Sequence, residues 1–380
     1  MAYANLPVTD KPNVGWRRLF TDASILRSLS DCLTPAGEAA PSTGILMKSI
    51  ARLDHAIIIA GACGEGRLEL IHHLIRCVQA YLPSTSIPLG TSALIAGHDT
   101  QQIPNSLQDI PCLDTPPSFS AFISLYSQGP FILRGFACDW PALQNHPWNS
   151  PKYLQSVAGP GRIVPVEVGR DYREADWSQT LMKWDDFLSN VFAYQSGETV
   201  LYLAQHNLFA QFPALQDDII IPDYVYASLP PPKDYPHYRP PGNDEQLVLN
   251  VWLGPRGTIS PAHTDPFFNF YVQVVGEKTV WLAPPHATPY MYSYPSTDVD
   301  PSPHAHNPAS NKASPSMSNT SQVDVFAPPS EHGDFPLFQR HVPSLAMSAT
   351  LQPGDMLFFP PGWWHAMRSE STSFSVSMWF

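Results

Sequence analysis

Cysteine is scarce in this sequence and follows no metal-binding spacing. The 380 residues include five cysteines, an odd number, spread along the chain without a C-x-x-C pair: Cys32, Cys63, Cys77, Cys112 and Cys138. This spacing excludes a thiolate zinc motif and argues against a disulfide framework. A reducing compartment fits best, so we expect an intracellular protein and leave nucleus and cytoplasm open.

Positive charge and long apolar runs are also in short supply. Lys and Arg number 21 against 33 Asp and Glu, a formal net charge of -12. This balance is unsuited to neutralising phosphates, so we expect no direct nucleic-acid binding and a basic protein or peptide as partner. The sequence begins without a signal-peptide pattern, and the apolar stretch at 56–63 is too short to cross a bilayer, which predicts a soluble protein without membrane contact.

A nucleotide-binding motif is absent from the first third, which has a helical pattern instead. The segment "GACGEG" at 61–66 lacks the Lys and the Ser/Thr of a phosphate-binding loop, and we interpret it as a helix end and turn. Apolar residues recur at helical spacing in "LELIHHLIRCVQAYL" (68–82), and more weakly after a possible cap at Thr21 or Asp22. We therefore expect residues 1–112 to form an N-terminal helical region.

From about residue 118 the sequence changes to short β-rich runs broken by Pro and Gly, which is typical of an antiparallel sandwich or barrel. In the last run, Ser373, Ser375 and Ser377 alternate with bulkier apolar residues, which indicates a small polar face turned toward a ligand. A Pro/Ser/Asn-rich segment at about 296–318 is expected to be a surface insertion without chemistry. Eight runs are candidate strands for two facing sheets: 130–136, 162–169, 200–205, 246–254, 269–276, 278–285, 355–361 and 373–380.

The segment "SPAHTDPFFNFYVQVVGEKTVWLAPP" (260–285) contains a candidate metal site. His263 and Asp265 stand two residues apart, so in an extended strand both side chains point the same way. We expect them to open a strand that turns at Gly276-Glu277 and returns as a hairpin. Competing patterns at 304–306 and 332–334 lie in or beside Pro-rich loops, which favours the first pair. With His365 as a third ligand, the set matches the two-histidine, one-carboxylate triad of non-haem Fe(II) oxygenases.

Lys278 separates an oxygenase from other metal-binding proteins of this shape. It begins the returning strand, where its ammonium could meet the distal carboxylate of 2-oxoglutarate. The alternative is a solvated lysine in a hairpin. Its coincidence with the triad favours the cofactor role.

The segment from about 130 to 380 resembles the JmjC family of 2-oxoglutarate oxygenases. The resemblance rests on "VPVEVGRDY", "DWSQTLM", "YLAQHNLF", "GTISPAHTDP", "NTSQVDV" and "SFSVSMW". It implies an α+β, mainly β fold, a jelly-roll double-stranded β-helix over 113–380. It also implies that Fe(II) is held by His263, Asp265 and His365, and that 2-oxoglutarate and O2 are co-substrates. Lys278 would bind the far carboxylate of 2-oxoglutarate with hydroxyls of Tyr202 and Ser260, and Asn269 would contact the near carboxylate.

The same resemblance implies hydroxylation of a protein side chain, with arginine at C-3 as the first candidate and N-methyl-lysine demethylation as its close variant. Glu167 is a candidate partner for a cationic substrate and Trp252 a candidate aromatic wall, although a surface Glu and a core Trp are the plain alternatives. Asp171 and Tyr172 are further candidates in the adjacent loop. Phe267-Phe268 predicts an unusually aromatic lining after Asp265. A 2-oxoglutarate oxygenase of a non-protein substrate and a binding module or zinc cupin without oxidation remain the other readings.

Overall fold

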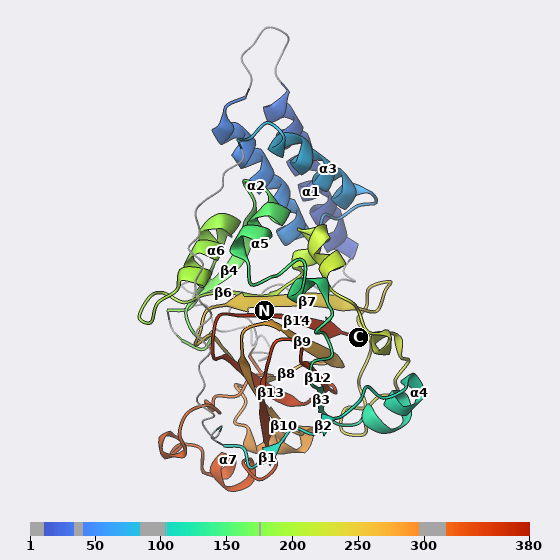
Figure 1. Ribbon diagram of the computed structural model, residues 1–380, viewed down its shortest axis with the longest axis vertical. Coiled ribbons are helices and arrows are strands. Elements are labelled where there is room, and N and C mark those ends of the chain that lie inside the picture. Colours follow the sequence, from blue (N-terminus) through green and yellow to red (C-terminus); the bar gives the residue numbers. More distant parts are fainter. Residues whose placement is uncertain (1–10, 34–40, 84–102, 104, 175, 296–316) are drawn as a thin grey trace, which may run out of the picture.

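Three helices form the N-terminal end of the molecule (Figure 1). The computed structural model describes residues 11–33, 41–83, 103, 105–174, 176–295 and 317–380. Helices α1 (Lys11–Cys32), α2 (Thr43–Ala60) and α3 (Arg67–Gln79) pack around a small apolar core that includes Ile50, Leu53 and Ile71. No helix in these ranges is both long and apolar enough to cross a membrane.

The helical pattern of α3 is confirmed, as is the turn between α2 and α3. The predicted cap of the first helix is wrong, because α1 begins at Lys11 and Thr21 lies within it. The Thr21 hydroxyl donates to the carbonyl of Arg17 one turn back, which satisfies it without ending the helix. A polar residue bonded in this way resembles a cap in sequence.

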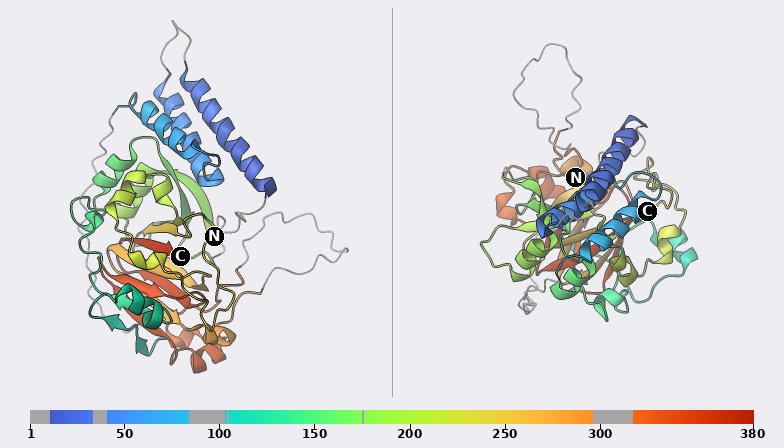
Figure 2. Two further views of the ribbon diagram at one scale, coloured as in Figure 1. Left: turned by 90° about the vertical axis from the view of Figure 1, so that its right-hand side faces the viewer. Right: turned by 90° about the horizontal axis from the view of Figure 1, so that it is seen from above.

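Two facing sheets form the rest of the molecule, which confirms the α+β, mainly β prediction (Figure 2). The smaller sheet has the order β1-β11-β10-β13-β8, and the larger has the order β2-β3-β12-β9-β14-β7-β6-β4-β5. An apolar cluster between them draws residues from both, including Tyr271 and Leu357 of the larger sheet and Val280 and Leu282 of the smaller. The interior between the sheets is therefore a packed core with the candidate site at one end.

The strands of the smaller sheet are β1 (Gln108–Asp109), β8 (Ile259–Thr264), β10 (Lys278–Ala283), β11 (Met347–Leu351) and β13 (Trp364–Ser369). Those of the larger are β2 (Cys112–Leu113), β3 (Phe131–Leu133), β4 (Ile163–Val168), β5 (Ser178–Lys183), β6 (Leu201–His206), β7 (Val248–Gly254), β9 (Asn269–Val275), β12 (Met356–Phe359) and β14 (Ser373–Trp379). Further α-helices are α4 (Phe119–Ala121), α5 (Pro151–Ala158), α6 (Trp184–Ala193) and α7 (Pro336–His341). A short π-helix is η1 (Phe122–Tyr126). Short 3-10 helices are η2 (Pro141–Leu143), η3 (Leu208–Ala210), η4 (Pro213–Asp218), η5 (Asp223–Tyr226), η6 (Pro285–Tyr290) and η7 (Pro329–Glu331).

All eight predicted runs contain a strand, but the predicted hairpin is wrong. β9 pairs with β12 and β14 in the larger sheet, whereas β10 pairs with β11 and β13 in the smaller. Gly276-Glu277 therefore carries the chain from one sheet to the other. Both strands are buried along their whole length, so alternation could not show which sheet each joins.

His263 and Asp265 also lie on a different element from the one expected. His263 is near the end of β8, and Asp265 belongs to the turn after it, since β9 begins only at Asn269. Pro266 follows directly and has no N–H to continue the ladder. β8 contains Pro261 and little apolar alternation, which is why its sequence did not indicate a strand.

The serine alternation in β14 runs through a fully buried strand. Ser375 donates to the side-chain oxygen of Gln273, and the Trp252 indole donates to Ser377. The small polar face thus lies against polar groups of the interior. The insertion at 296–318 lies outside the described residues except for its last two positions, and the division at residue 112 stays a prediction.

Candidate active site

The three predicted metal ligands converge at one end of the smaller sheet. His365 on β13 is registered directly opposite His263 on β8, and Asp265 reaches the pair from the following turn. Asp265 Oδ2 lies 3.4 Å from His365 Nε2 and 4.0 Å from His263 Nε2. One ligand atom from each residue can be chosen so that all three lie within 4.8 Å of one another.

Backbone carbonyls orient both imidazoles. His263 Nδ1 donates to the carbonyl of Pro261 at 2.7 Å, and His365 Nδ1 donates to that of Trp363 at 3.0 Å. The outer nitrogen of each ring is thereby occupied, and each Nε2 points toward Asp265, where it can bind a metal ion once it carries no proton. This arrangement is typical of metal-binding histidines.

The protonation of the cluster also suits a cation. Burial, together with the neighbouring His365, lowers the pKa of His263 to about 4. Burial alone would raise the pKa of Asp265, but the hydrogen bond to His365 and the charges of the two imidazoles lower it. A neutral His263 and an ionised Asp265 are the forms that bind a divalent metal.

Lys278 is almost fully buried, at 1% exposed, and points between two tyrosines. Its Nζ donates to the Tyr271 hydroxyl at 2.9 Å and to the Tyr202 hydroxyl at 3.4 Å. Ser260 and Tyr202 line the adjoining cavity together. Burial lowers the pKa of Lys278 to about 7. A buried ammonium with only neutral partners among the described residues calls for an anionic ligand.

Asn269 lines a small hollow beside the three predicted metal ligands, and its side chain has an unsatisfied hydrogen-bond acceptor. It is 3% exposed, and its Oδ1 has no hydrogen-bond partner among the described residues. The hollow is lined by Trp252, Ser260, His263, Asp265, Asn269, Tyr271, His365, Met367 and Trp379. Buried polar atoms without partners are uncommon in folded proteins, so the residues present fit a polar ligand beside the metal ligands.

Tyr271 is one functional candidate that the sequence analysis missed. It stands two positions after Asn269 on β9, so both side chains point to the same side of the strand. That spacing could have identified it once Asn269 was chosen. Its aromatic ring inside an apolar run instead suggested an ordinary core residue, and it does also belong to the core between the sheets.

A larger cavity of about 260 Å³ adjoins the hollow and shares His263, Ser260 and Trp252 with it. Both predicted substrate residues line it, together with Trp177, which was not predicted. Glu167 accepts a hydrogen bond from the Trp177 indole at 3.3 Å. Burial, and the nearby charge of Asp171, raise the pKa of Glu167. Glu167 is thus a half-buried carboxylate without an ion pair among the described side chains, rather than a fully exposed residue.

Two other expectations turn out differently. Phe268 is fully buried and packs against Phe358 and Phe380, so it belongs to the core and does not line the site. Only Phe267 stays near the hollow, stacked on Trp379. Of the competing histidine patterns, His332 bonds to the carbonyl of Asp324, and 304–306 lies outside the described residues.

A β-sandwich with a His-Asp-His cluster at one end is the arrangement expected of a cupin-type protein with a metal site. A family model described as "Cupin-like domain" matches residues 119–380. The chain is 33% identical to the zebrafish protein "Lysine-specific demethylase 8" over 374 residues, 96% of this chain and 81% of that one. It is 39% identical to "Jumonji C domain-containing protein 5" of Drosophila melanogaster over 276 residues, 72% of this chain and 60% of that one.

A more distant relative has a different printed activity. The human "Bifunctional peptidase and (3S)-lysyl hydroxylase JMJD7" is 24% identical over 294 residues, which are 71% of this chain and 84% of that protein. Together with the family match, these relatives show that the chain belongs to the cupin-like JmjC family of 2-oxoglutarate-dependent oxygenases. The family implies dependence on Fe(II) and 2-oxoglutarate in general.

Proposed function

We propose that the protein hydroxylates a side chain of a basic protein or peptide, with arginine at C-3 as the substrate group. The observation that carries this proposal is Glu167, a half-buried carboxylate that lines, together with Trp177 and Trp252, the cavity that reaches His263. A guanidinium pairs with a carboxylate through two parallel hydrogen bonds and stacks on aromatic faces. The choice of arginine and of C-3 follows the family resemblance.

In this proposal His263, Asp265 and His365 hold the iron and leave its remaining positions to co-substrates. Lys278 binds the distal carboxylate of 2-oxoglutarate, with hydroxyls of Tyr202, Ser260 and Tyr271 around it, and Asn269 contacts the near carboxylate. When bound, Fe(II) and 2-oxoglutarate activate dioxygen, so that carbon dioxide and succinate are released and one oxygen atom enters a C–H bond of the substrate.

The protein residues then have the task of placing one carbon near that centre. Glu167 fixes the cationic end of the substrate side chain, and the two tryptophans restrict its plane. Because the cavity joins the hollow at His263, a chain held at its far end presents a methylene to the metal side. The half-buried surroundings also strengthen the Glu167 interaction relative to one in open water.

N-methyl-lysine demethylation is the second candidate, favoured by the printed name of the zebrafish relative and by the aromatic pair, which also suits a methylated ammonium. The two reactions share every residue above and differ in which carbon is oxidised. A hydroxyl on an N-methyl group is lost as formaldehyde, whereas one on a methylene persists. No feature of the described cavity favours a non-protein substrate over a protein side chain.

Mass spectrometry of arginine and N-methyl-lysine peptides incubated with protein, Fe(II), 2-oxoglutarate and air tests the proposal. We expect one added oxygen on arginine, no change with His263→Ala, and a roughly 10- to 100-fold higher peptide KM with Glu167→Gln, because a charge-assisted hydrogen bond is lost. Glu174→Gln is the matched control, since Glu174 lines the same cavity but is exposed. Demethylation without hydroxylation would establish the second candidate, and an unchanged KM with Glu167→Gln would remove the role of Glu167.

A further inference from the structure

One wall of the larger cavity is the loop between β4 and β5, and a buried ion pair lies inside that loop. Tyr172, Arg173, Glu174 and Trp177 all line the cavity. The Arg173 side chain is 12% exposed and that of Asp171 is 8% exposed. Arg173 Nε and Nη2 donate to the Asp171 carboxylate at 3.0 and 2.5 Å, and the Arg173 backbone N–H donates to the same group at 2.9 Å. Such a pair gives the loop a fixed shape.

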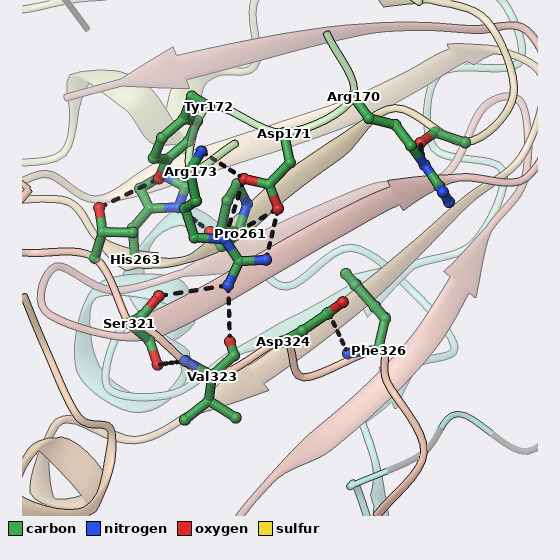
Figure 3. Close-up of polar contacts among 12 residues, drawn as sticks. Arg170, Asp171, Tyr172, Arg173, Pro261, His263, Ser321, Val323, Asp324 and Phe326 are labelled. Carbon is green, nitrogen blue, oxygen red and sulfur yellow. Dashed lines mark hydrogen bonds and ion pairs between the residues drawn. The ribbon is translucent and has the colours of Figure 1, made fainter. Parts of the chain in front are cut away.

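The remaining nitrogen of the Arg173 guanidinium, Nη1, contacts a segment outside the loop. Arg173 Nη1 donates to the carbonyl of Val323 at 3.1 Å and, more weakly, to that of Ser321 at 3.5 Å (Figure 3). The Tyr172 hydroxyl adds a hydrogen bond of 3.2 Å to Thr320. Two adjacent residues thus attach the cavity wall to one short segment, Thr320–Val323, about 150 residues away in the sequence.

That segment pairs in turn with β8, the strand that contains the predicted metal ligand His263. Ser321 N–H donates to the carbonyl of Ala262 at 2.8 Å, and His263 and Thr320 form an antiparallel bridge. The connection therefore runs from the wall of the cavity through Arg173 to the backbone on both sides of His263.

We infer that Arg173 is a positioning residue, which holds the wall of the substrate cavity at a fixed distance from the metal strand. The inference rests on the proposed function, because the cavity is taken as the substrate site. Arginine suits this role since its planar group can offer one edge to a carboxylate while a separate nitrogen reaches carbonyls. Lysine carries the charge without that geometry.

A second arginine–carboxylate pair, Arg134 with Asp355, provides a control that distinguishes a positioning role from a general effect on stability. Arg134 Nη1 donates to the Asp355 carboxylate at 2.6 Å and to the carbonyl of Thr350 at 2.9 Å, so it combines the same two kinds of partner. It lines neither the cavity nor the hollow. Arg134→Gln is accordingly the matched control for Arg173→Gln.

The experiment measures steady-state kinetics and amide hydrogen exchange of both variants. We expect Arg173→Gln to raise the KM for the peptide at least tenfold, because a small displacement of a binding wall weakens substrate binding strongly. The KM for 2-oxoglutarate and the rate of succinate formation without peptide should change less than twofold. Amides of the loop and of Thr320–Val323 should exchange faster. Arg134→Gln should alter none of these, and Arg173→Lys should recover part of the loss.

Exchanging the two residues, Asp171→Arg with Arg173→Asp, gives a second test. The swap keeps an opposite-charge pair but leaves position 173 without a donor for the carbonyls of Ser321 and Val323, so we expect no rescue. A rescue, an unchanged peptide KM, or an equal rise in both KM values would overturn the inference. If the unaltered protein modifies no peptide, the proposed function has failed, and hydrogen exchange still decides whether Arg173 joins the two segments.

Discussion

The environment of Lys278 is unfavourable for its charged form unless an anionic ligand is bound. Burial lowers its pKa from 10.5 to about 7, which corresponds to a cost of roughly 5 kcal/mol for the charged form relative to water. Its nearest titratable groups are Tyr202 and Tyr271, and burial raises the pKa of both, so neither supplies a counter-charge. A dicarboxylate would supply the missing negative charge.

This cost predicts how the stability of the ligand-free protein depends on pH. The folded pKa is lower than the unfolded one, so between about 7 and 10.5 the unfolded chain binds the extra proton and stability rises with pH. We expect Lys278 to add about 2 kcal/mol to the free energy of unfolding between pH 7 and pH 9. Denaturant titrations at both values would measure it.

Lys278→Met is the control for that measurement. The variant should lack this rise, should be more stable than the original protein at pH 7, and should lose 2-oxoglutarate binding. A variant that is less stable at pH 7 would contradict the view that Lys278 is a charge buried for ligand binding.

At the scale of single residues, the meeting of His263, Asp265 and His365 could be predicted because metal chemistry restricts the residue types. Their partners could not. The carbonyls of Pro261 and Trp363, which orient the histidines, carry no side-chain signal. Glu167 and Trp252 were named without any means of knowing that Trp177 joins them.

The crossing between β9 and β10 is the element on which the site depends, because it brings Tyr271 in one sheet within hydrogen-bond distance of Lys278 in the other. Gly276 makes this crossing possible. Its φ is +67°, and an added Cβ would lie 2.0 Å from the carbonyl oxygen of Thr372. Few alternatives to glycine exist at such a position.

Gly276→Ala should therefore destabilise the protein by about 2 to 5 kcal/mol, from left-handed backbone strain plus the clash. Gly129→Ala, where nothing lies within 4 Å of an added Cβ, should change stability by about 0.5 kcal/mol or less. Chemical denaturation of both variants provides the comparison. Equal stabilities would show that the crossing tolerates a side chain.

The strand positions could be predicted from runs of β-forming residues, but their pairing could not. A two-residue connection with glycine first is typical of a hairpin, and nothing in the sequence distinguishes it from a crossing between sheets. The missed strands of more than two residues, β5, β8, β11 and β13, contain Pro261, several serines and Arg368 in place of apolar alternation. Tertiary pairing, rather than local preference, makes them strands.

A second element-scale contact joins the N-terminal helices to the larger sheet. Asp54 on α2 is fully buried and accepts hydrogen bonds from the Arg162 guanidinium at 2.7 to 3.1 Å. It also accepts from the backbone N–H of Ile163 at 3.0 Å and the side chain of Gln211 at 2.9 Å. The carboxylate thus satisfies donors from two separate parts of the β-rich half.

Asp54→Asn should cost about 3 to 5 kcal/mol of stability, because it leaves the buried guanidinium uncompensated. Arg27→Gln, which breaks an exposed pair with Asp31, should cost less than about 1 kcal/mol. Thermal unfolding would compare them. A small effect of Asp54→Asn would mean that the helices are attached mainly by other contacts.

At the scale of the whole molecule, the change in sequence composition at the boundary between the helices and the β-sandwich does not coincide with the first strands of the sandwich. The sequence changes character near residue 118, yet β1 at Gln108–Asp109 and β2 at Cys112–Leu113 already pair within the two sheets. Short strands of this kind have too few residues to show a pattern. The site itself lies at the far side of this boundary, between strands that only the complete fold assembles.

The measurement that tests the central claim most directly is turnover under ¹⁸O-labelled dioxygen, with mass spectrometry of both the peptide and succinate. We predict one heavy oxygen atom on the arginine side chain and one in succinate, with at least as much labelled succinate as labelled peptide, and neither with His263→Ala. Unlabelled peptide with unchanged 2-oxoglutarate would contradict the assignment of this site as an oxygenase acting on arginine.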